Sequence, residues 1–301
     1  TISTTNNANL CPGSTLTLTS SSATNNVWST GETTASIIAS AAGQFSLINV
    51  DANGCMATPS LTVVEQPAPV VTVSASCPVL LNGNSITFNS SATIASGSIA
   101  SYAWSSGATV VSTAASYTTS TGGVYLLNVI STEGCSTLTP VMADITSPLA
   151  GTYTIGGASS CSNFTSFANA FAAINTRGVA GNVTFEVASG YTETAPVGGL
   201  TMSQCNLAAN LMSGPLQTIS FVKTGSGANP KINAGIGTIA GSSNTYTDVI
   251  VKIIGADNVT FNGIDLFDGN ASGNAMMETG LGIYKCGTLN GANDVLYTNG
   301  T

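Results

Sequence analysis

The stretch Cys11-Pro12-Gly13-Ser14-Thr15-Leu16-Thr17-Leu18-Thr19 opens the pattern on which the first half of the chain is built. Its threonines and leucines alternate at a period of two, as the residues of a half-buried strand do. The pattern continues through Trp28-Ser29-Thr30-Gly31 and closes on Asp51-Ala52-Asn53-Gly54-Cys55, where Asn and Gly favour a hairpin turn because they tolerate positive φ. Short strands separated by turn signals at intervals of about ten residues predict a β-sandwich.

The pattern has a second copy, which runs from Cys77-Pro78 through Trp104-Ser105-Ser106-Gly107 to Glu133-Gly134-Cys135. Between the two copies lies Glu65-Gln66-Pro67-Ala68-Pro69, whose prolines favour an extended, semi-rigid linker. We therefore predict two tandem β-sandwich domains, residues 1–66 and 67–147, followed by a third domain over residues 148–301.

The composition narrows the classes of protein to which the chain can belong. With 43% hydrophobic and only 6% charged residues, it does not have the low hydrophobicity and high charge of a disordered chain. Its five basic residues cannot form a phosphate-binding stripe, which argues against nucleic acid as a partner. No apolar run reaches the roughly 18 residues of a membrane span. The absence of His removes the commonest general base and zinc ligand.

The chain has seven cysteines, and their spacings do not resemble those of CxxC metal sites. They therefore indicate structural disulfides and an oxidising compartment, where such bonds persist. The chain opens with Thr1-Ile2-Ser3-Thr4, without a Met or a basic leader. We therefore expect it to be a mature or excised piece of a longer precursor.

The frame of the first copy resembles the immunoglobulin/PKD-like repeats of large surface adhesins in gliding bacteria of the Bacteroidetes. The second copy departs from this frame at Glu133-Gly134-Cys135 and at its stretched opening, Cys77-Pro78-Val79-Leu80-Leu81-Asn82-Gly83. The resemblance implies a spacer or adhesive array secreted through the type IX machinery, either attached to the outer membrane at the cell surface or released. Its implied partners are that machinery, a surface glycan or other adhesive target, and further domains of the same chain.

The pairing of the cysteines is predicted from the modules that they bracket. We favour one bond around each module and one that clamps the third domain, namely Cys11–Cys55, Cys77–Cys135 and Cys161–Cys205. Cys286 is then left over, either free and buried or paired beyond residue 301. In a simple immunoglobulin topology, however, the start of strand B and the F–G turn lie at opposite ends. The pairing within each module therefore stays open, because a disulfide needs Cα atoms within about 7 Å.

The third domain begins with a predicted helix over residues 165–176. Its apolar stripe is Phe164, Phe167, Phe171 and Ile174, at steps of three and four residues, with Ser162 or Asn163 as the N-cap and Gly178 as the stop. Short strands are predicted afterwards, at 182–187, 219–222, 231–233, 249–254 and 259–261.

Residues 251–266, Val-Lys-Ile-Ile-Gly-Ala-Asp-Asn-Val-Thr-Phe-Asn-Gly-Ile-Asp-Leu, resemble one coil of a right-handed parallel β-helix of the pectin-lyase-like kind. Residues 151–157, the helix and residues 183–187 resemble the N-terminal cap of that fold. The predicted fold class is therefore all-β, with two tandem immunoglobulin-like sandwiches followed by the capped first coils of an incomplete β-helix. Because stacked coils leave an apolar end, we expect the chain to continue or a partner to cover it.

A β-helix raises the question of polysaccharide cleavage, which needs two suitably spaced carboxylates. Asp257, Asp265 and Asp268 are the candidates, with Lys252 as the nearest base and Arg177 far away in the cap. Because Asp265 and Asp268 differ by three positions, they would face opposite sides of a strand. Turns whose aspartates bond to backbone N–H groups explain these residues without catalysis, and we predict no catalytic residues.

Two other kinds of ligand can be weighed. Calcium is the metal that would suit the oxygens of Asp51-Ala52-Asn53, or of Asp265 with Asp268 and Asn270, but neither set has the ligand density of a calcium loop. We therefore predict no cofactor or metal. Trp28 and Trp104 could stack on sugars, but their equivalent positions favour core residues between the sheets of each sandwich.

The sequence therefore favours a non-enzymatic extracellular protein, an adhesin or filament segment with a spacer and adhesive role. The alternative is a carbohydrate-active β-helix enzyme, a lyase or hydrolase with accessory modules. Such an enzyme would require acidic and basic residues repeated on one face across successive coils, and this sequence shows no such cluster.

Overall fold

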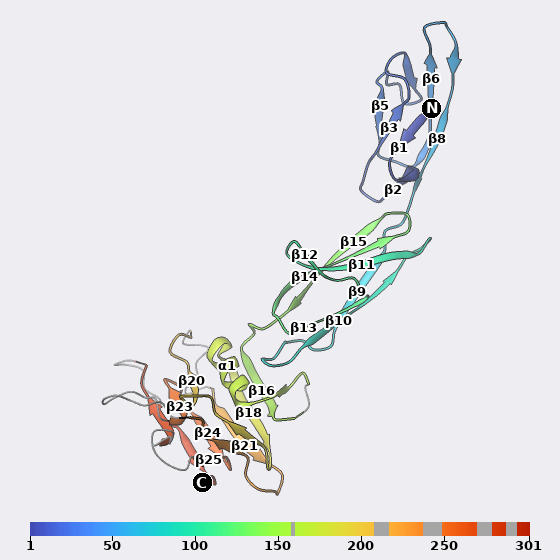
Figure 1. Ribbon diagram of the computed structural model, residues 1–301. Helices are drawn as coiled ribbons and strands as arrows, with labels where there is room; N and C mark the ends of the chain where they lie inside the picture. Colours follow the sequence, from blue (N-terminus) through green and yellow to red (C-terminus); the bar gives the residue numbers. More distant parts are fainter. Residues whose placement is uncertain (158–159, 208–216, 237–248, 270–278, 287–293) are drawn as a thin grey trace. The chain divides into compact units, whose positions relative to one another are not determined.

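The computed structural model describes residues 1–157, 160–207, 217–236, 249–269, 279–286 and 294–301 (Figure 1). The chain divides into two compact units. Unit 1 comprises Thr1–Ala75, Thr87–Tyr117 and Gly123–Met142, and unit 2 comprises Ser76–Ile86, Thr118–Gly122 and Ala143–Thr301. The predicted border at residue 66 lies inside unit 1, and parts of the predicted domain 67–147 belong to unit 2.

The first module, residues 1–66, is a sandwich of two sheets. Its strands are β1 (Ile2–Thr4), β2 (Asn9–Leu10), β3 (Leu16–Ser20), β4 (Asn26–Trp28), β5 (Ser36–Ala39), β6 (Gly43–Val50), β7 (Met56–Ala57) and β8 (Ser60–Glu65). One sheet has the order β1-β3-β5 and the other β2-β8-β6-β4, with β7 paired to β6. With β1, β3 and β5 as strands A, B and E, and β4, β6 and β8 as C, F and G, this order is immunoglobulin-like.

The alternation predicted from the opening stretch is confirmed, since Leu16 and Leu18 are buried and Thr17 and Thr19 are exposed. The inward side chains of both sheets form one apolar cluster around Trp28, which is 2% exposed. Its indole Nε1 donates to the carbonyl of Thr34 at 2.9 Å, so the polar end of this buried ring has a partner.

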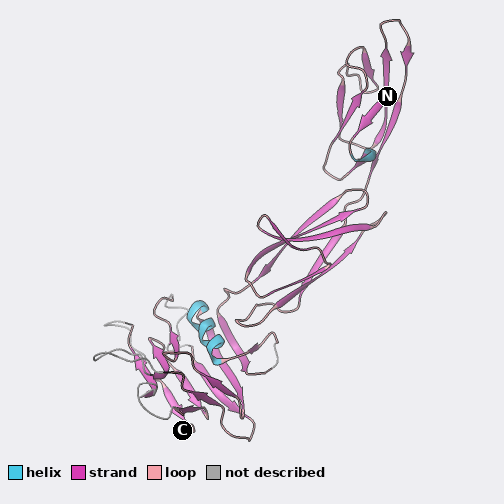
Figure 2. Ribbon diagram, in the orientation of Figure 1, coloured by secondary structure: helices cyan, strands magenta, loops and turns pink. Residues whose placement is uncertain are grey.

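The second module, residues 67–147, repeats this arrangement (Figure 2). Its strands are β9 (Val70–Ala75), β10 (Ile86–Thr93), β11 (Ile99–Ser106), β12 (Thr109–Ser112), β13 (Ser116–Thr119), β14 (Gly123–Ser131) and β15 (Ser136–Ala143). The two sheets have the orders β13-β10-β9 and β12-β11-β14-β15. The order again separates strands A, B and E from strands C, F and G, so both modules are immunoglobulin-like.

Trp104 is the counterpart of Trp28 and is fully buried. Its ring stacks on Phe88 and Tyr117, with centroids 6.0 Å apart in both pairs, and its Nε1 donates to the carbonyl of Ala114 at 3.0 Å. The prediction that both tryptophans are core residues rather than sugar platforms is therefore confirmed.

The described residues of unit 2 form three parallel sheets. Its strands are β16 (Leu149–Ile155), β17 (Asn163–Phe164), β18 (Val179–Ala188), β19 (Thr192–Thr194), β20 (Leu200–Ser203), β21 (Ile219–Thr224), β22 (Lys231–Asn233), β23 (Val249–Ile254), β24 (Val259–Asn262), β25 (Asp265–Phe267), β26 (Thr279–Tyr284) and β27 (Leu296–Thr298). The sheet orders are β17-β16-β18-β21-β24-β27, β19-β22-β25 and β20-β23-β26. The chain visits the three sheets in the same sequence on each pass, and the strand pairs with determined register in them are parallel.

Register places equivalent aromatic residues of successive strands above one another. Phe185 pairs with Phe221, and Phe221 pairs with Phe261. Their rings stack with centroids 4.7 and 4.8 Å apart, and the ring planes are nearly parallel, with interplanar angles of 9° and 7°. Each side chain is at most 1% exposed, so this column of rings forms the centre of the unit 2 core.

The helix α1 (Phe167–Arg177) covers part of this core. Ser166 is its N-cap, accepting from the N–H of Asn169, and Gly178 ends it with φ at 68°. Ser162 and Asn163 are therefore not the cap, because Asn163 lies in the short strand β17 (Asn163–Phe164) and the helix begins only at Phe167. Phe164 is buried as predicted, but it lies in the short strand β17.

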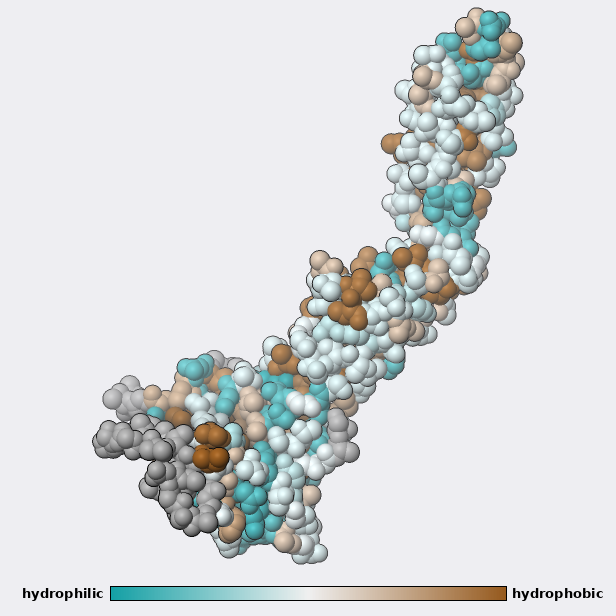
Figure 3. All heavy atoms as spheres, in the orientation of Figure 1, coloured by the Kyte–Doolittle hydropathy of each residue, from teal (hydrophilic) through white to brown (hydrophobic). Residues whose placement is uncertain are grey.

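The surface matches the scarcity of charge. In Figure 3 most of the visible described surface is pale, which marks residues of intermediate hydropathy. Hydroxyl groups and the net charge of −8 must therefore supply much of the solubility of the protein.

Candidate functional site: crosslinks between predicted domains

Two of the three disulfides cross a predicted domain border, and the third lies within the predicted third domain. The bonds are Cys11–Cys135, Cys77–Cys161 and Cys205–Cys286, with Cα atoms 5.3, 5.2 and 5.3 Å apart. The predicted pairs Cys11–Cys55, Cys77–Cys135 and Cys161–Cys205 are therefore corrected. Cys286 is bonded, and Cys55 is the exposed free cysteine.

Strand order explains why no bond brackets a module. Cys11 lies just before β3, the B strand, whereas Cys55 lies in the turn after β6, the F strand. In an immunoglobulin-like sandwich these positions are at opposite ends, too far apart for a disulfide. The cysteines at the ends of modules can therefore bond only beyond their own module.

Cys135 is 1% exposed and has two contacts with the first module. Besides its bond to Cys11, its Sγ lies 3.8 Å from the carbonyl oxygen of Gln66. A Cβ on the neighbouring Gly134 would come within 2.7 Å of the Asn6 side-chain oxygen, so glycine permits this close approach. Nearby, Thr137 donates to the carbonyl of Pro69 at 2.6 Å. The junction between the modules thus combines a covalent bond with polar contacts.

Cys77 opens a loop, Ser76–Ile86, that belongs to unit 2. Its bond to Cys161 ties the loop to unit 2, where Leu81 of the loop is part of the apolar core and Val79 packs against that core. Asn84 donates to the carbonyl of Asn163 at 2.6 Å. This loop is the stretched opening that departs from the repeat. Its apolar run was the sequence signal for a second covering element, which the prediction from the helix alone missed.

Arg177, the last residue of α1, lies under this loop and is 2% exposed. Its guanidinium donates to the carbonyl of Leu80 and, at 3.3 Å, to the side chain of Asn82. Burial lowers the pKa of Arg177, and the carboxylate of Asp144 acts in the opposite direction. The arginine therefore anchors the loop to the helix and is not available as a catalytic base.

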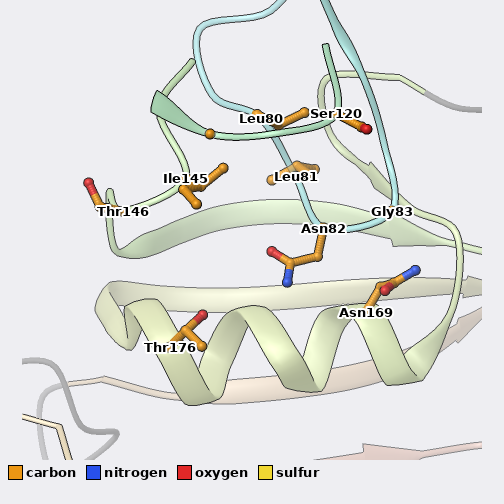
Figure 4. Close-up of a pocket in the computed structure, with 10 residues that line it drawn as sticks. Leu80, Leu81, Asn82, Gly83, Ser120, Ile145, Thr146, Asn169 and Thr176 are labelled. Carbon is orange, nitrogen blue, oxygen red and sulfur yellow. The ribbon is translucent and has the colours of Figure 1, made fainter. Parts of the chain in front are cut away.

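A pocket of about 430 Å³ lies between this loop and the helix (Figure 4). Its labelled lining includes Leu80 and Ile145 on one side and Asn169 and Thr176 of the helix on the other. None of the described residues that line it is charged, and they offer hydroxyl and amide groups for contact.

Asp144 accepts several hydrogen bonds where the chain leaves the second module. The hydroxyl of Ser147 and the N–H of Thr146, the latter at 2.8 Å, donate to its carboxylate and lower its pKa to about 2. Because the folded pKa lies below the unfolded value of about 3.9, its contribution to stability is present above that value and is lost as the pH falls towards 2. We expect NMR titration to find this low pKa, and Ser147→Ala to raise it. A normal pKa in the parent protein would contradict these contacts.

The third disulfide, Cys205–Cys286, lies over the turn that follows β23. A Cβ on Gly255 would come within 1.9 Å of the Cys286 sulfur, and Gly255 has φ at 64°. Glycine is therefore needed at this turn for both backbone conformation and space. The bond ties two stretches of unit 2 that are 81 residues apart.

The candidate acidic residues do not share one site. Asp257 lies in the turn between β23 and β24, whereas Asp265 begins β25. The Asp265 Oδ1 accepts from Asn229 at 2.8 Å and from the N–H of Thr301 at 3.0 Å, and Lys252 donates to the carbonyl of Gly198 at 2.7 Å. Asp265 and Lys252 thus make structural contacts. Asp268 follows the end of β25.

The structure also places residues of the two predicted calcium-ligand sets. The Asp51 Oδ1 accepts from the N–H groups of Asn53 and Cys55, both at 2.8 Å, which is the predicted turn. Asn270, the third member of the other set, lies outside the described residues. Within the described ranges, no three His, Cys, Asp or Glu side chains gather as metal ligands would.

Comparisons with known proteins find immunoglobulin-like and fibronectin-like structures. No protein-family model matches the chain, and no curated protein matches it. Among solved structures, fibronectin(III)-like modules of Clostridium thermocellum CbhA are 15% identical, with a TM-score of 0.32, covering 47% of this chain and 92% of that one. The three N-terminal domains of the bacteriophage RB49 Highly Immunogenic Outer Capsid protein are 18% identical, with a TM-score of 0.24, covering 51% and 63%. The N-terminal four Ig domains of Dscam1 are 10% identical, with a TM-score of 0.23, covering 45% and 42%.

The disulfides bear on the compartment of the protein. Three such bonds are typical of extracellular or cell-surface proteins, because cytosolic thiols are kept reduced. The part of the chain that the structure describes contains no helix long and apolar enough to cross a membrane.

Proposed function

We propose that this chain is a segment of a non-enzymatic surface protein in which the two immunoglobulin-like modules act as spacers. Residues 148–301 would form the capped first coils of a right-handed parallel β-helix, which could carry an adhesive surface for a glycan. The resemblance to gliding-bacterial adhesins adds secretion through the type IX machinery and attachment at the outer membrane.

The observation that carries this proposal is the course of the disulfides. Cys11–Cys135 crosses the border predicted at residue 66, and Cys77–Cys161 crosses the border predicted at residue 147. Each bond thus joins stretches of two predicted domains within one compact unit, Cys11–Cys135 in unit 1 and Cys77–Cys161 in unit 2, which suits a spacer that transmits force. Interfaces between domains of one chain are otherwise usually compatible with relative motion.

The parallel register supports the β-helix part of the proposal. Successive strands stack in three sheets, and equivalent phenylalanines form one column. Interior columns of like side chains are expected where each pass of the chain repeats the last. The helix and the Ser76–Ile86 loop would then serve as the cover that a first coil needs.

The test against the enzyme alternative is incubation of the purified protein with uronate polysaccharides. We expect no new reducing ends or unsaturated products, because Asp265 already accepts two structural hydrogen bonds and Arg177 is buried. Turnover that Asp265→Asn abolishes, and that the control Asp51→Asn in the first module leaves intact, would overturn the proposal in favour of a carbohydrate-active enzyme.

A further inference from the structure

The opening and closing cysteines of the modules follow one rule of pairing. The opening cysteines are Cys11 and Cys77, and the closing cysteines are Cys55 and Cys135. Both opening cysteines bond to a cysteine of the next predicted domain along the chain, Cys135 and Cys161 respectively. Conversely, the bonded closing cysteine, Cys135, reaches back to the opening cysteine of the module before it.

The closing turns of the two modules have the same geometry. In the first, the N–H of Asp51 donates to the carbonyl of Cys55 at 2.9 Å, and in the second Ser131 does so to Cys135 at 2.8 Å. Each turn contains a glycine with positive φ, 82° in the first and 87° in the second. The side chain of Asp51 accepts from the Cys55 N–H at 2.8 Å, as that of Ser131 accepts from the Cys135 N–H at 3.1 Å. Cys55 is therefore the structural equivalent of Cys135.

The surroundings of the two cysteines differ in one respect. Cys135 is buried under residues of the preceding module, whereas Cys55 is exposed. A Cβ on Gly54 would meet no atom within 4 Å, although one on Gly134 would contact Asn6. The closing turn of the first module thus has the same geometry as the closing turn of the second, but no described residue of another module packs against it.

The chain also enters both modules beside the closing turn. In the second module, Pro69 immediately precedes β9 and accepts a hydrogen bond from Thr137, two residues after Cys135. In the first, Thr1 precedes β1 and its carbonyl accepts from Ser21 at 3.0 Å, in the loop that ends at Asn25. The carbonyl of Asn25 in turn accepts from Val50, the residue before the closing turn. A module preceding Thr1 would therefore approach the end that carries Cys55.

We propose that Cys55 forms a disulfide with the opening cysteine of a further sandwich module that lies ahead of this one in the full-length protein. This inference rests on the proposed role as a segment of a modular array. Two thiols lose two protons and two electrons, and a small disulfide oxidant such as oxidised glutathione accepts them and becomes two thiols. The array is then a series of modules in which each opening cysteine is bonded to a cysteine of the next domain.

The test counts free thiols in the full-length protein isolated from the cells that make it, denatured in the presence of an alkylating reagent. In the parent protein we expect Cys55 to escape alkylation, and its unreduced peptide to be joined to a Cys-Pro peptide from outside these 301 residues. In Cys55→Ser, the cysteine that would have bonded to Cys55 has no partner, so the number of free thiols rises by one per chain. The matched control Asn53→Ser, in the same exposed turn, leaves the number unchanged.

A decrease in the number of free thiols on going from the parent protein to Cys55→Ser would overturn the inference. If Cys55 is unpaired, the parent protein has it alkylated and Cys55→Ser loses one thiol. A Cys55–Cys55 bond between two copies, or a mixed disulfide with a small thiol, also contradicts it, and the peptide map identifies each. None of these results depends on polysaccharide turnover, so failure here is distinct from failure of the non-enzymatic role.

Discussion

Phe221→Ala is expected to destabilise unit 2 by about 3–5 kcal/mol, the usual cost of removing a fully buried phenylalanine ring. Phe221 is fully buried and is the middle ring of the column, 4.7 Å from Phe185 and 4.8 Å from Phe261. Its ring also packs against those of Phe167 and Phe171 of the helix, with ring centroids 5.8 and 5.4 Å apart. The substitution therefore removes contacts between successive strands and with the covering helix together.

The distribution of tryptophan separates this effect from a general loss of stability. Both tryptophans, Trp28 and Trp104, lie in unit 1, so their fluorescence reports on the modules. In denaturant titrations we expect the far-ultraviolet circular dichroism of Phe221→Ala to lose its unit 2 transition early, while the tryptophan transition stays in place. The control is Phe267→Ala, because Phe267 is 49% exposed and the Lys231 ammonium lies over its ring. This substitution should lower the stability of unit 2 by about 1 kcal/mol or less. Equal effects of the two substitutions would disprove the role of the column.

Replacing both Cys77 and Cys161 by serine is expected to cost unit 2 about 2–5 kcal/mol, because the bond closes a loop of 84 residues in the unfolded chain. In the folded protein the bond also keeps Leu81 against the core and Leu80 over Arg177. The loss should therefore be concentrated in the Ser76–Ile86 loop.

Hydrogen exchange provides the local measurement for this variant. The N–H of Leu80 donates to the carbonyl of Asp144 at 2.8 Å, so its amide should be protected in the parent protein and exchange faster in the double variant. A reductant supplies the control, since the parent protein and the variant should behave alike in this loop once all disulfides are reduced. Unchanged protection of Leu80 in the oxidised variant would show that apolar contacts alone hold the loop.

Local patterns were sufficient to predict much of the fold. The alternation at Leu16 and Leu18 placed a strand correctly, because a period of two is a direct property of the extended backbone. The equivalent tryptophans, Trp28 and Trp104, were correctly placed in the cores. The helix was found within two residues of its bounds, since its apolar stripe has the period of the element itself.

The cysteine pairs could not be obtained in the same way. A disulfide requires two residues to meet in space, and the order of strands in the two sheets decides which ends of a module can meet. The repeat suggested that Cys11 belongs with Cys55, but the sandwich places the B-strand start and the F–G turn apart, and Cys11 bonds to Cys135 instead. Cys286, predicted to be free or paired beyond residue 301, meets Cys205 because the strands that precede them, β26 and β20, flank β23 in one parallel sheet.

The candidate acidic residues and the covering loop also separate what the sequence predicts from what only the tertiary structure decides. From the sequence alone we predicted no catalytic residues, and the absence of histidine removes the commonest general base. The sequence could not show that Asp265 is held by Asn229 and the N–H of Thr301, nor that the apolar run around Leu81 leaves its own repeat to cover the unit 2 core. Composition and period are local properties that can be counted along the chain. Partners distant in sequence depend on strand order and register, which exist only once the sheets have formed.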